Sequence, residues 1–153
     1  MRQFLSRLFG QDAALGDAAA SFGAEQLATA VLMVETARLD GAVQPLERDR
    51  IQHLLAKRFG LTPWVAAELL GRAERTATES VAWQGLTHTL KEALDADGRV
   101  EILELLWEVA YADGALHDYE ASLLRRVGGL LYVSDRDNGD ARLRVMQRLG
   151  IPR

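Results

Sequence analysis

Apolar residues recur every three or four positions along most of the chain, which is the spacing of amphipathic helices. Strand-like alternation is not sustained anywhere, and β-branched residues are sparse. The pattern predicts an all-α domain of seven or eight helices. The expected inner faces are Leu27, Ala30, Val31, Val34 and Ala37; Leu46, Ile51, Leu54, Leu55 and Phe59; Val65, Ala66, Leu69, Leu70 and Ala73; Val81, Trp83, Leu86, Leu90 and Leu94; Ile102, Leu105, Leu106, Val109 and Ala112; and Tyr119, Leu123, Leu124, Val127 and Leu131.

Turn and capping residues divide this pattern into helices. Thr62, followed by Pro63, is a typical N-cap with proline at the first helical position. The segment 95–98 is expected to break or bend the chain. Ser134 is a suitable cap, and we expect the final helix over about Asp140–Leu149, after an acidic loop at 135–140.

The first 23 residues differ in composition from the rest. Residues 2–9 place four apolar side chains on one helical face, and residues 11–23 are rich in Ala, Gly and Asp. We expect a short helix docked on the body and then a linker, with a membrane-surface or partner-binding helix as the alternative. The all-α domain is therefore expected to span residues 24–153.

One segment of the chain occurs twice. Residues 35–47 and 108–120, offset by 73 positions, are identical at six of thirteen positions. The identical pairs are Glu35/Glu108, Ala37/Ala110, Asp40/Asp113, Gly41/Gly114, Ala42/Ala115 and Glu47/Glu120. We infer an internal duplication of a helix–turn–helix unit, and we call Asp40-Gly41 and Asp113-Gly114 the DG turns.

The repeated acids have two interpretations. Glu47 and Glu120 fall near the third position of a helix, where a carboxylate accepts from free backbone N–H groups. Asp40 and Asp113 end a helix, where the dipole disfavours a negative charge, although an Asx-turn accounts for them structurally. Alternatively, the four acids converge and bind a divalent cation, for which carboxylate oxygens suit Ca²⁺, Mg²⁺ or Mn²⁺, and Zn²⁺ is also considered.

The DG turns are not EF-hand loops, although D-G-x-h-x-x-x-E matches the second half of that motif. The first and third loop positions fall on Thr36 and Arg38 in one copy and on Val109 and Tyr111 in the other. Neither pair chelates Ca²⁺, and the helical pattern continues through both. A third match over residues 97–104 also lacks an acid at the first position.

Composition excludes several classes of function. The net charge of −4, without a Lys/Arg run, argues against nucleic acid as a partner. Cysteine is absent, and no apolar run approaches the ~20 residues of a membrane span. The chain carries no nucleophile elbow, phosphate-binding glycine loop or dinucleotide fingerprint. We expect a cytoplasmic protein without enzymatic activity, with Trp64, Trp83 and Trp107 in the core or at its boundary.

The segments V-E-T-A-R-L-D-G-A-V-Q-P-L-E-R and L-W-E-V-A-Y-A-D-G-A-L-H-D-Y-E, with the V-S-D-R-D-N-G tail, resemble the TerB-like superfamily. That group includes tellurite-resistance protein TerB and the N-terminal domain of a membrane-anchored DnaJ-type co-chaperone. The resemblance implies about seven helices and a role in stress response or protein assembly. It also implies a divalent-metal cluster at Asp40, Glu47, Asp113 and Glu120, with Glu35 and Glu108 as weaker candidates.

The leading hypothesis is therefore a non-catalytic TerB-like module that binds a divalent cation and engages protein partners, membrane-associated ones included. The alternative is a pure protein–protein interaction scaffold, in which the acids only stabilise turns and helix N-termini. An exposed apolar groove beside the N-terminal helix would favour the scaffold.

Overall fold

The computed structural model describes residues 22–38, 43–77, 83–114, 116 and 118–152. Over these ranges the chain forms helices and no strand, which confirms the all-α prediction. The expected helix at 2–9 and most of the expected linker lie outside them. The helices are α3 (Ala24–Ala37), α4 (Pro45–Phe59), α5 (Pro63–Ala77), α6 (Trp83–Ala93), α7 (Ala96–Ala110), α8 (Asp118–Leu130) and α9 (Asp135–Leu149).

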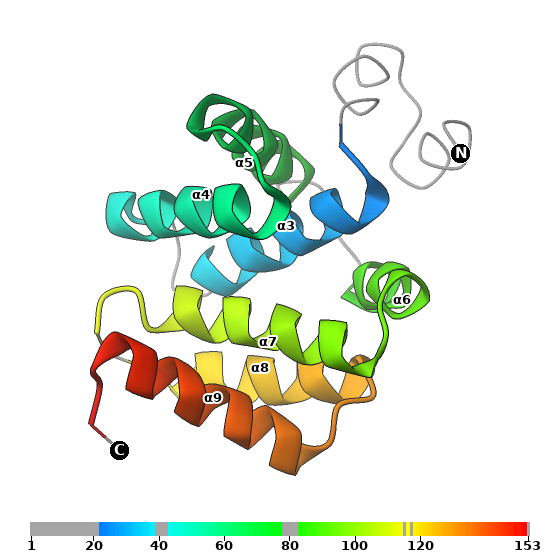
Figure 1. The fold of residues 1–153 in the computed structure, drawn as a ribbon, viewed down its shortest axis with the longest axis vertical. Coiled ribbons are helices and arrows are strands. Elements are labelled where there is room, and N and C mark those ends of the chain that lie inside the picture. The colour runs from blue at the N-terminus through cyan, green and yellow to red at the C-terminus, as the bar shows by residue number, and fades with distance from the viewer. Residues whose placement is uncertain (1–21, 39–42, 78–82, 115, 117, 153) are drawn as a thin grey trace.

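Helix α3 occupies the centre of the bundle, with α4 and α5 on one side and α7, α8 and α9 on the other (Figure 1). Every residue from Leu27 to Val34 is buried, and α3 contacts α5, α6 and α7. The spacing of apolar residues predicts one buried stripe along α3. Instead, α3 is buried on all sides, because its middle residues are apolar all round and neighbouring helices cover each face. The two repeated hairpins, α3–α4 and α7–α8, pack against each other through α3 and α7.

The centre of α3 holds one polar group that lacks a partner. The hydroxyl of Thr29 is fully buried and has no hydrogen-bond partner among the described residues. The hydroxyl of Thr36, on the same helix and equally buried, donates to the carbonyl oxygen of Leu32 at 2.8 Å. The two threonines therefore differ in hydrogen bonding at similar burial.

We expect Thr29→Val to raise the free energy of unfolding by about 1 kcal/mol, because it removes an unsatisfied buried hydroxyl while keeping the side-chain shape. Thr36→Val is the matched control and is expected to be neutral or destabilising, since it removes a made hydrogen bond. Urea unfolding of both variants gives the comparison. Equal effects of the two substitutions would contradict the difference in hydrogen bonding between Thr29 and Thr36.

Helix ends follow the capping residues closely. Gly60 ends α4 in the left-handed conformation with φ of 63°, which glycine adopts without a Cβ penalty. Asp95 caps α7, and its carboxylate accepts from the N–H of Gly98 at 2.8 Å. The segment 95–98 therefore breaks the chain between α6 and α7, as predicted, and its last three residues form the first turn of the new helix.

The predicted start of the last helix is wrong by about five residues. Ser134 caps α9, as expected, but the helix begins directly after it, at Asp135. The hydroxyl of Ser134 accepts from the N–H of Asp137 at 3.1 Å. The acids that suggested a loop lie instead in the first turn, where negative charge complements the helix dipole.

Asn138, in this first turn, joins three helices. It is 4% exposed, and its Oδ1 accepts from Nε1 of Trp107 on α7 at 2.9 Å. Its Nδ2 donates to the carbonyl oxygen of Leu124 on α8 at 3.1 Å. The indole only donates and the carbonyl only accepts, so the amide orientation is fixed. Asn138 is thus the one residue of the D-R-D-N-G segment that enters the core, and the other four are exposed.

The prediction for the tryptophans is correct for two of three. Trp107 is buried and Trp83 is partly buried against the core. Trp64, at the second position of α5, is 75% exposed. It follows Pro63 at the helix start, where the side chain extends into solvent.

Candidate functional site at the DG turns

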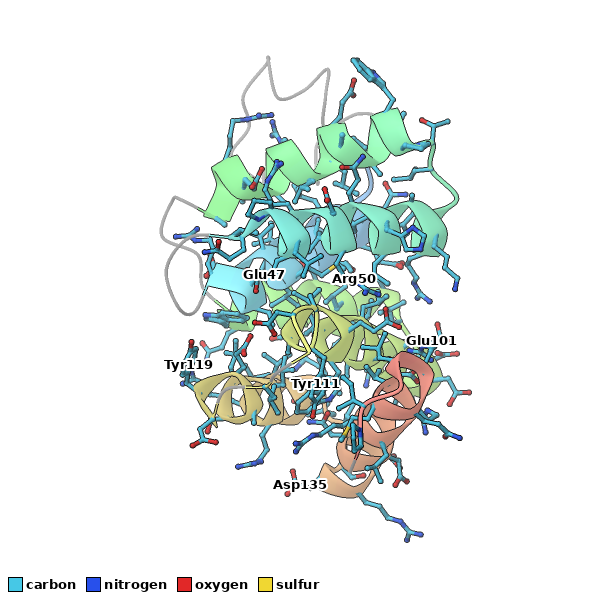
Figure 2. The ribbon with its side chains drawn as sticks, turned by 90° about the vertical axis from the view of Figure 1, so that its left-hand side faces the viewer. Glu47, Arg50, Glu101, Tyr111, Tyr119 and Asp135 are labelled. Atoms are coloured by element: carbon cyan, nitrogen blue, oxygen red, sulfur yellow. The ribbon has the colours of Figure 1, made fainter. Side chains whose placement is uncertain are left out.

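The helix ends that flank the two DG turns in the sequence lie at the same end of the bundle. The carboxyl ends of α3 and α7 and the amino ends of α4 and α8 all lie on the left in Figure 1. Figure 2 shows that side of the molecule, with Glu47 on α4 and Tyr119 on α8 both toward the left of the view. The internal repeat therefore brings the equivalent ends of α3 and α7, and those of α4 and α8, to one side of the molecule.

Glu47 is the third residue of α4 and is 9% exposed. Its Oε1 accepts from the backbone N–H of Gln44, the N-cap residue, at 2.9 Å. This is one half of a capping box, in which the carboxylate satisfies an N–H that the helix cannot. The structural interpretation of Glu47 is thus confirmed by its geometry.

Glu120 lies at the equivalent position in the first turn of α8 and is 5% exposed. A buried carboxylate is stable only when hydrogen bonds or opposite charges offset its lost hydration. Both repeats therefore hold a glutamate inside the fold at the start of the second helix. This burial fixes the backbone on which the neighbouring residues are presented.

Asp113 lies in a different environment from Glu47 and Glu120. It is exposed in the turn that follows α7, where Gly114 has φ of 85° and its N–H bonds the carbonyl oxygen of Tyr111 at 2.9 Å. Asp40 lies outside the described residues. Within the described ranges no group of three or more acids and histidines is arranged to hold a metal ion. The four-acid metal site stays a prediction, since Asp40 is one of its members.

The weaker ligand candidates are engaged in ion pairs. Glu108 is 7% exposed, and its Oε1 accepts from Nε of Arg148 on α9 at 2.8 Å. Its Oε2 lies 4.0 Å from Nη1 of Arg50 on α4. Glu108 thus links three helices, which is a structural role. Glu35 lies 3.6 Å from Nη1 of Arg38, one turn along α3.

Burial raises the pKa of the Glu35 carboxyl above its ordinary value, and the charge of Arg38 opposes this only in part. Glu74 shows the opposite behaviour. Its hydrogen bonds with Arg48, at 2.7 and 2.8 Å, lower the pKa of its carboxyl. The two glutamates therefore contribute to the pH dependence of stability with opposite signs.

We expect Glu35→Gln to change how stability varies with pH. The folded pKa is raised, so the native state binds more protons than the unfolded state between about 4.3 and the folded pKa. Wild-type stability falls as pH rises through that window, whereas Gln cannot titrate. The free energy of unfolding of Glu35→Gln minus that of the wild type should therefore increase with pH in this window. The same difference for Glu74→Gln should decrease with pH. Urea unfolding from pH 3 to 7 measures both differences.

Two residues expected in the core are exposed instead. Leu46 is 54% exposed and Tyr119 is 43% exposed, so their assignment to inner helical faces is wrong. They are equivalent positions, 73 residues apart, and each immediately precedes a buried glutamate. The half-buried Val43 and Leu116 are also equivalent and precede them in each turn. We call these four residues the DG-turn patch.

The sequence held a signal for this patch. Comparing the repeats position by position shows that Leu46 and Tyr119 precede the glutamate that enters the fold. Successive helical residues are 100° apart, so the residue beside a buried position can lie at the margin of the buried face and be exposed. Helical periodicity counts every apolar residue as a candidate for the core, whereas the repeat marks Leu46 and Tyr119 as equivalent positions.

Comparison with known families agrees with this architecture. The family model of tellurite resistance protein TerB matches residues 26–143, a range that spans both DG turns. The chain belongs to the TerB family. The match covers α4 to α8 completely and most of α3 and α9. Comparisons with curated proteins and with solved structures find no match. TerB membership therefore accounts for the fold, and the site must be interpreted from its own residues.

In the described part of this TerB-family chain, no helix combines the length and apolarity needed to cross a membrane.

Proposed function

We propose that the chain is a non-catalytic TerB-family module that binds other proteins through the DG-turn patch. The observation that carries this proposal is the repeated exposure of apolar side chains. Leu46 and Tyr119 occupy the same position in both copies, beside Val43 and Leu116. Single exposed apolar residues need no explanation, but an apolar surface repeated at one end of a bundle is typical of protein-binding sites.

Charge near the patch indicates the chemistry of the partner. Asp49 and Asp118 are exposed on α4 and α8 near Leu46 and Tyr119. The whole chain carries a net charge of −4. Complementary charge steers association and selects among partners. We therefore propose a partner segment that offers an apolar anchor flanked by Lys or Arg.

In this proposal the acids support the patch and do not contact the partner. Glu47 accepts the N–H of its own N-cap residue, and Glu120 is buried at the equivalent position. These interactions hold the first turns of α4 and α8 in place. A preformed surface loses less entropy on binding than a flexible one.

The proposal includes no catalytic step. The chain has no cysteine, and His53 and His88 are exposed on separate helices. A binding role of this kind fits a function in protein assembly or stress response, and we carry that role forward as part of the proposal. We also propose that the module acts in the cytoplasm.

A displayed peptide library selected against the whole chain tests this function. We expect enriched peptides with an apolar residue flanked by basic ones. Leu46→Ser combined with Tyr119→Ser should weaken their binding by about tenfold or more, as expected for central interface residues. Trp64→Ser is the matched control, because Trp64 is also exposed but lies outside the patch. Peptides that bind all variants equally would contradict the proposal.

A second candidate function, divalent-cation binding at Asp40, Glu47, Asp113 and Glu120, is favoured by one observation. The two glutamates are buried at equivalent positions, each in the first turn of the second helix of its repeat. A cation bound to the native state raises the melting temperature in proportion to the logarithm of its concentration. Thermal unfolding with Ca²⁺, Mg²⁺, Mn²⁺ and Zn²⁺ therefore tests it directly.

If a cation binds, Asp113→Asn and Asp40→Asn should abolish the increase in melting temperature, and Asp118→Asn should not. Asp118 is a suitable control because it is an exposed acid at the start of α8. An increase that persists in all three variants would place the cation elsewhere. No increase with any of the four ions would exclude the site and leave the protein-binding function as the sole proposal.

A further inference from the structure

A pocket of about 270 Å³ lies where α7, α8 and α9 meet. This region is in the lower half of Figure 2, where Tyr111 and Asp135 are labelled. The pocket is separate from the DG-turn patch in its residues, and the proposed protein binding does not depend on it. Its lining is Trp107, Arg125, Asp135, Asn138, Gly139 and Arg142.

The Arg142 guanidinium is held in a fixed orientation. Its Nε donates to Oη of Tyr111 at 2.8 Å. Its Cζ lies 5.3 Å from the ring centroid of Trp107 and 6.0 Å from that of Tyr111. Trp107 is itself fixed by its hydrogen bond to Asn138. Among the described residues, no acceptor bonds the two terminal nitrogens of Arg142.

Arg125 presents a second guanidinium to the same pocket from α8. It is exposed and makes no hydrogen bond or ion pair within the described part of the chain. Two other arginines of α9 are used differently, since Arg144 and Arg148 pair with Glu104. The pocket thus combines two guanidinium groups with one carboxylate, that of Asp135, in a chain whose net charge is negative.

We propose that this pocket binds a phosphate group. Guanidinium groups present forked N–H donors that match oxyanions, and phosphate offers more acceptor oxygens than a carboxylate. Two such groups from different helices can contact different oxygens of one tetrahedral anion. The start of α9 is not the source of selectivity, because Asp135 and Asp137 already occupy its first turn. The volume of about 270 Å³ admits inorganic phosphate and also a small phosphomonoester, and the two present the same oxyanion chemistry.

A nitrogen-15 NMR titration of the whole chain tests the proposal, with ionic strength held constant by chloride. The indole N–H of Trp107 and the Nε–H of Arg142 report on the pocket. Inorganic phosphate and glycerol phosphate should both shift these signals in a saturable manner. Tighter binding of glycerol phosphate identifies a phosphomonoester as the ligand, and tighter binding of inorganic phosphate identifies the free ion. Acetate that binds as tightly as phosphate would overturn the assignment.

Substitutions locate the binding. Arg125→Gln and Arg142→Gln should each weaken phosphate binding by about tenfold, because each removes charge-assisted hydrogen bonds. Arg126→Gln and Arg136→Gln are controls, since both residues are exposed on the same two helices but do not line the pocket. Asp135→Asn should tighten binding by removing the one negative charge in the lining.

Arg142→Lys provides a second variant that keeps the charge and loses the forked donor, and it should bind with intermediate affinity. Shifts that grow linearly without saturation, or that respond equally to Arg125→Gln and Arg126→Gln, would overturn the proposal. Both patterns would show general screening of surface charge instead of a site.

Discussion

Asn138→Ala is expected to lower the free energy of unfolding by about 2–4 kcal/mol, the largest effect of any single substitution considered for this chain. The amide joins Nε1 of Trp107 to the carbonyl oxygen of Leu124 inside the core. Removing it leaves the buried indole N–H of Trp107 without its acceptor, at a cost of about 1–3 kcal/mol. It also removes the second hydrogen bond to the carbonyl oxygen of Leu124, worth about 1 kcal/mol. Urea unfolding followed by circular dichroism measures the loss.

Asp137→Ala is the control for this substitution. Asp137 precedes Asn138 in α9 but is exposed, so its replacement removes a favourable first-turn charge worth about 0.3–1 kcal/mol. If Asn138→Ala and Asp137→Ala destabilise equally, the three-helix bridge is not the source of the effect. Asn138→Ala should also broaden or shift the indole N–H signal of Trp107, which Asp137→Ala should leave in place.

Gly128→Ala is expected to destabilise the fold by about 2 kcal/mol, although alanine favours helices over glycine by about 1 kcal/mol. A Cβ on Gly128 would lie 2.5 Å from Nδ2 of Asn138, closer than real contacts allow. The amide cannot yield easily, because both of its hydrogen bonds are made inside the core. The adjacent Gly129 has no atom within 4 Å of its Cβ position.

Gly129→Ala is therefore the matched control and should be neutral or stabilising by up to about 1 kcal/mol. The Gly128→Ala/Asn138→Ala double variant is more decisive. With Asn138 shortened, the methyl group added at position 128 meets only an ordinary contact, 3.6 Å from Leu103. The Gly128→Ala substitution should then cost nothing or stabilise, because the two sites are coupled. Additive losses would contradict the steric explanation.

The helices could be predicted from the sequence because their causes are local. Helix α4 begins at Pro45 and ends before Gly60, as expected. Helix α5 begins at Pro63, directly after Thr62, which is also as expected. The start of α9 could not be predicted from composition. Residues 135–140 have the composition of a loop, yet they are helical. The hydroxyl of Ser134 caps the helix, and the buried Asn138 anchors its first turn in the core. The burial of Asn138 depends on contacts between distant helices, which periodicity does not encode.

The candidate site could be predicted only in part. The repeat identifies equivalent helix ends, and the first-turn role of Glu47 is confirmed by its hydrogen bond to Gln44. Convergence of all four acids stays a prediction, because it depends on Asp40. Leu46 and Tyr119 were assigned to the core, since a helical stripe does not distinguish its margin from its centre. Failures of this kind, where local rules break, concentrate at functional positions.

Site-specific photo-crosslinking in living cells shows whether the DG-turn patch binds another protein. A photoreactive amino acid is placed at position 46, 119 or 64 of the whole chain, one position at a time. We expect the same crosslinked partner from positions 46 and 119, and none from position 64, because the exposed Trp64 lies outside the patch. Equal crosslinking from all three positions, or none from 46 and 119, would contradict this expectation.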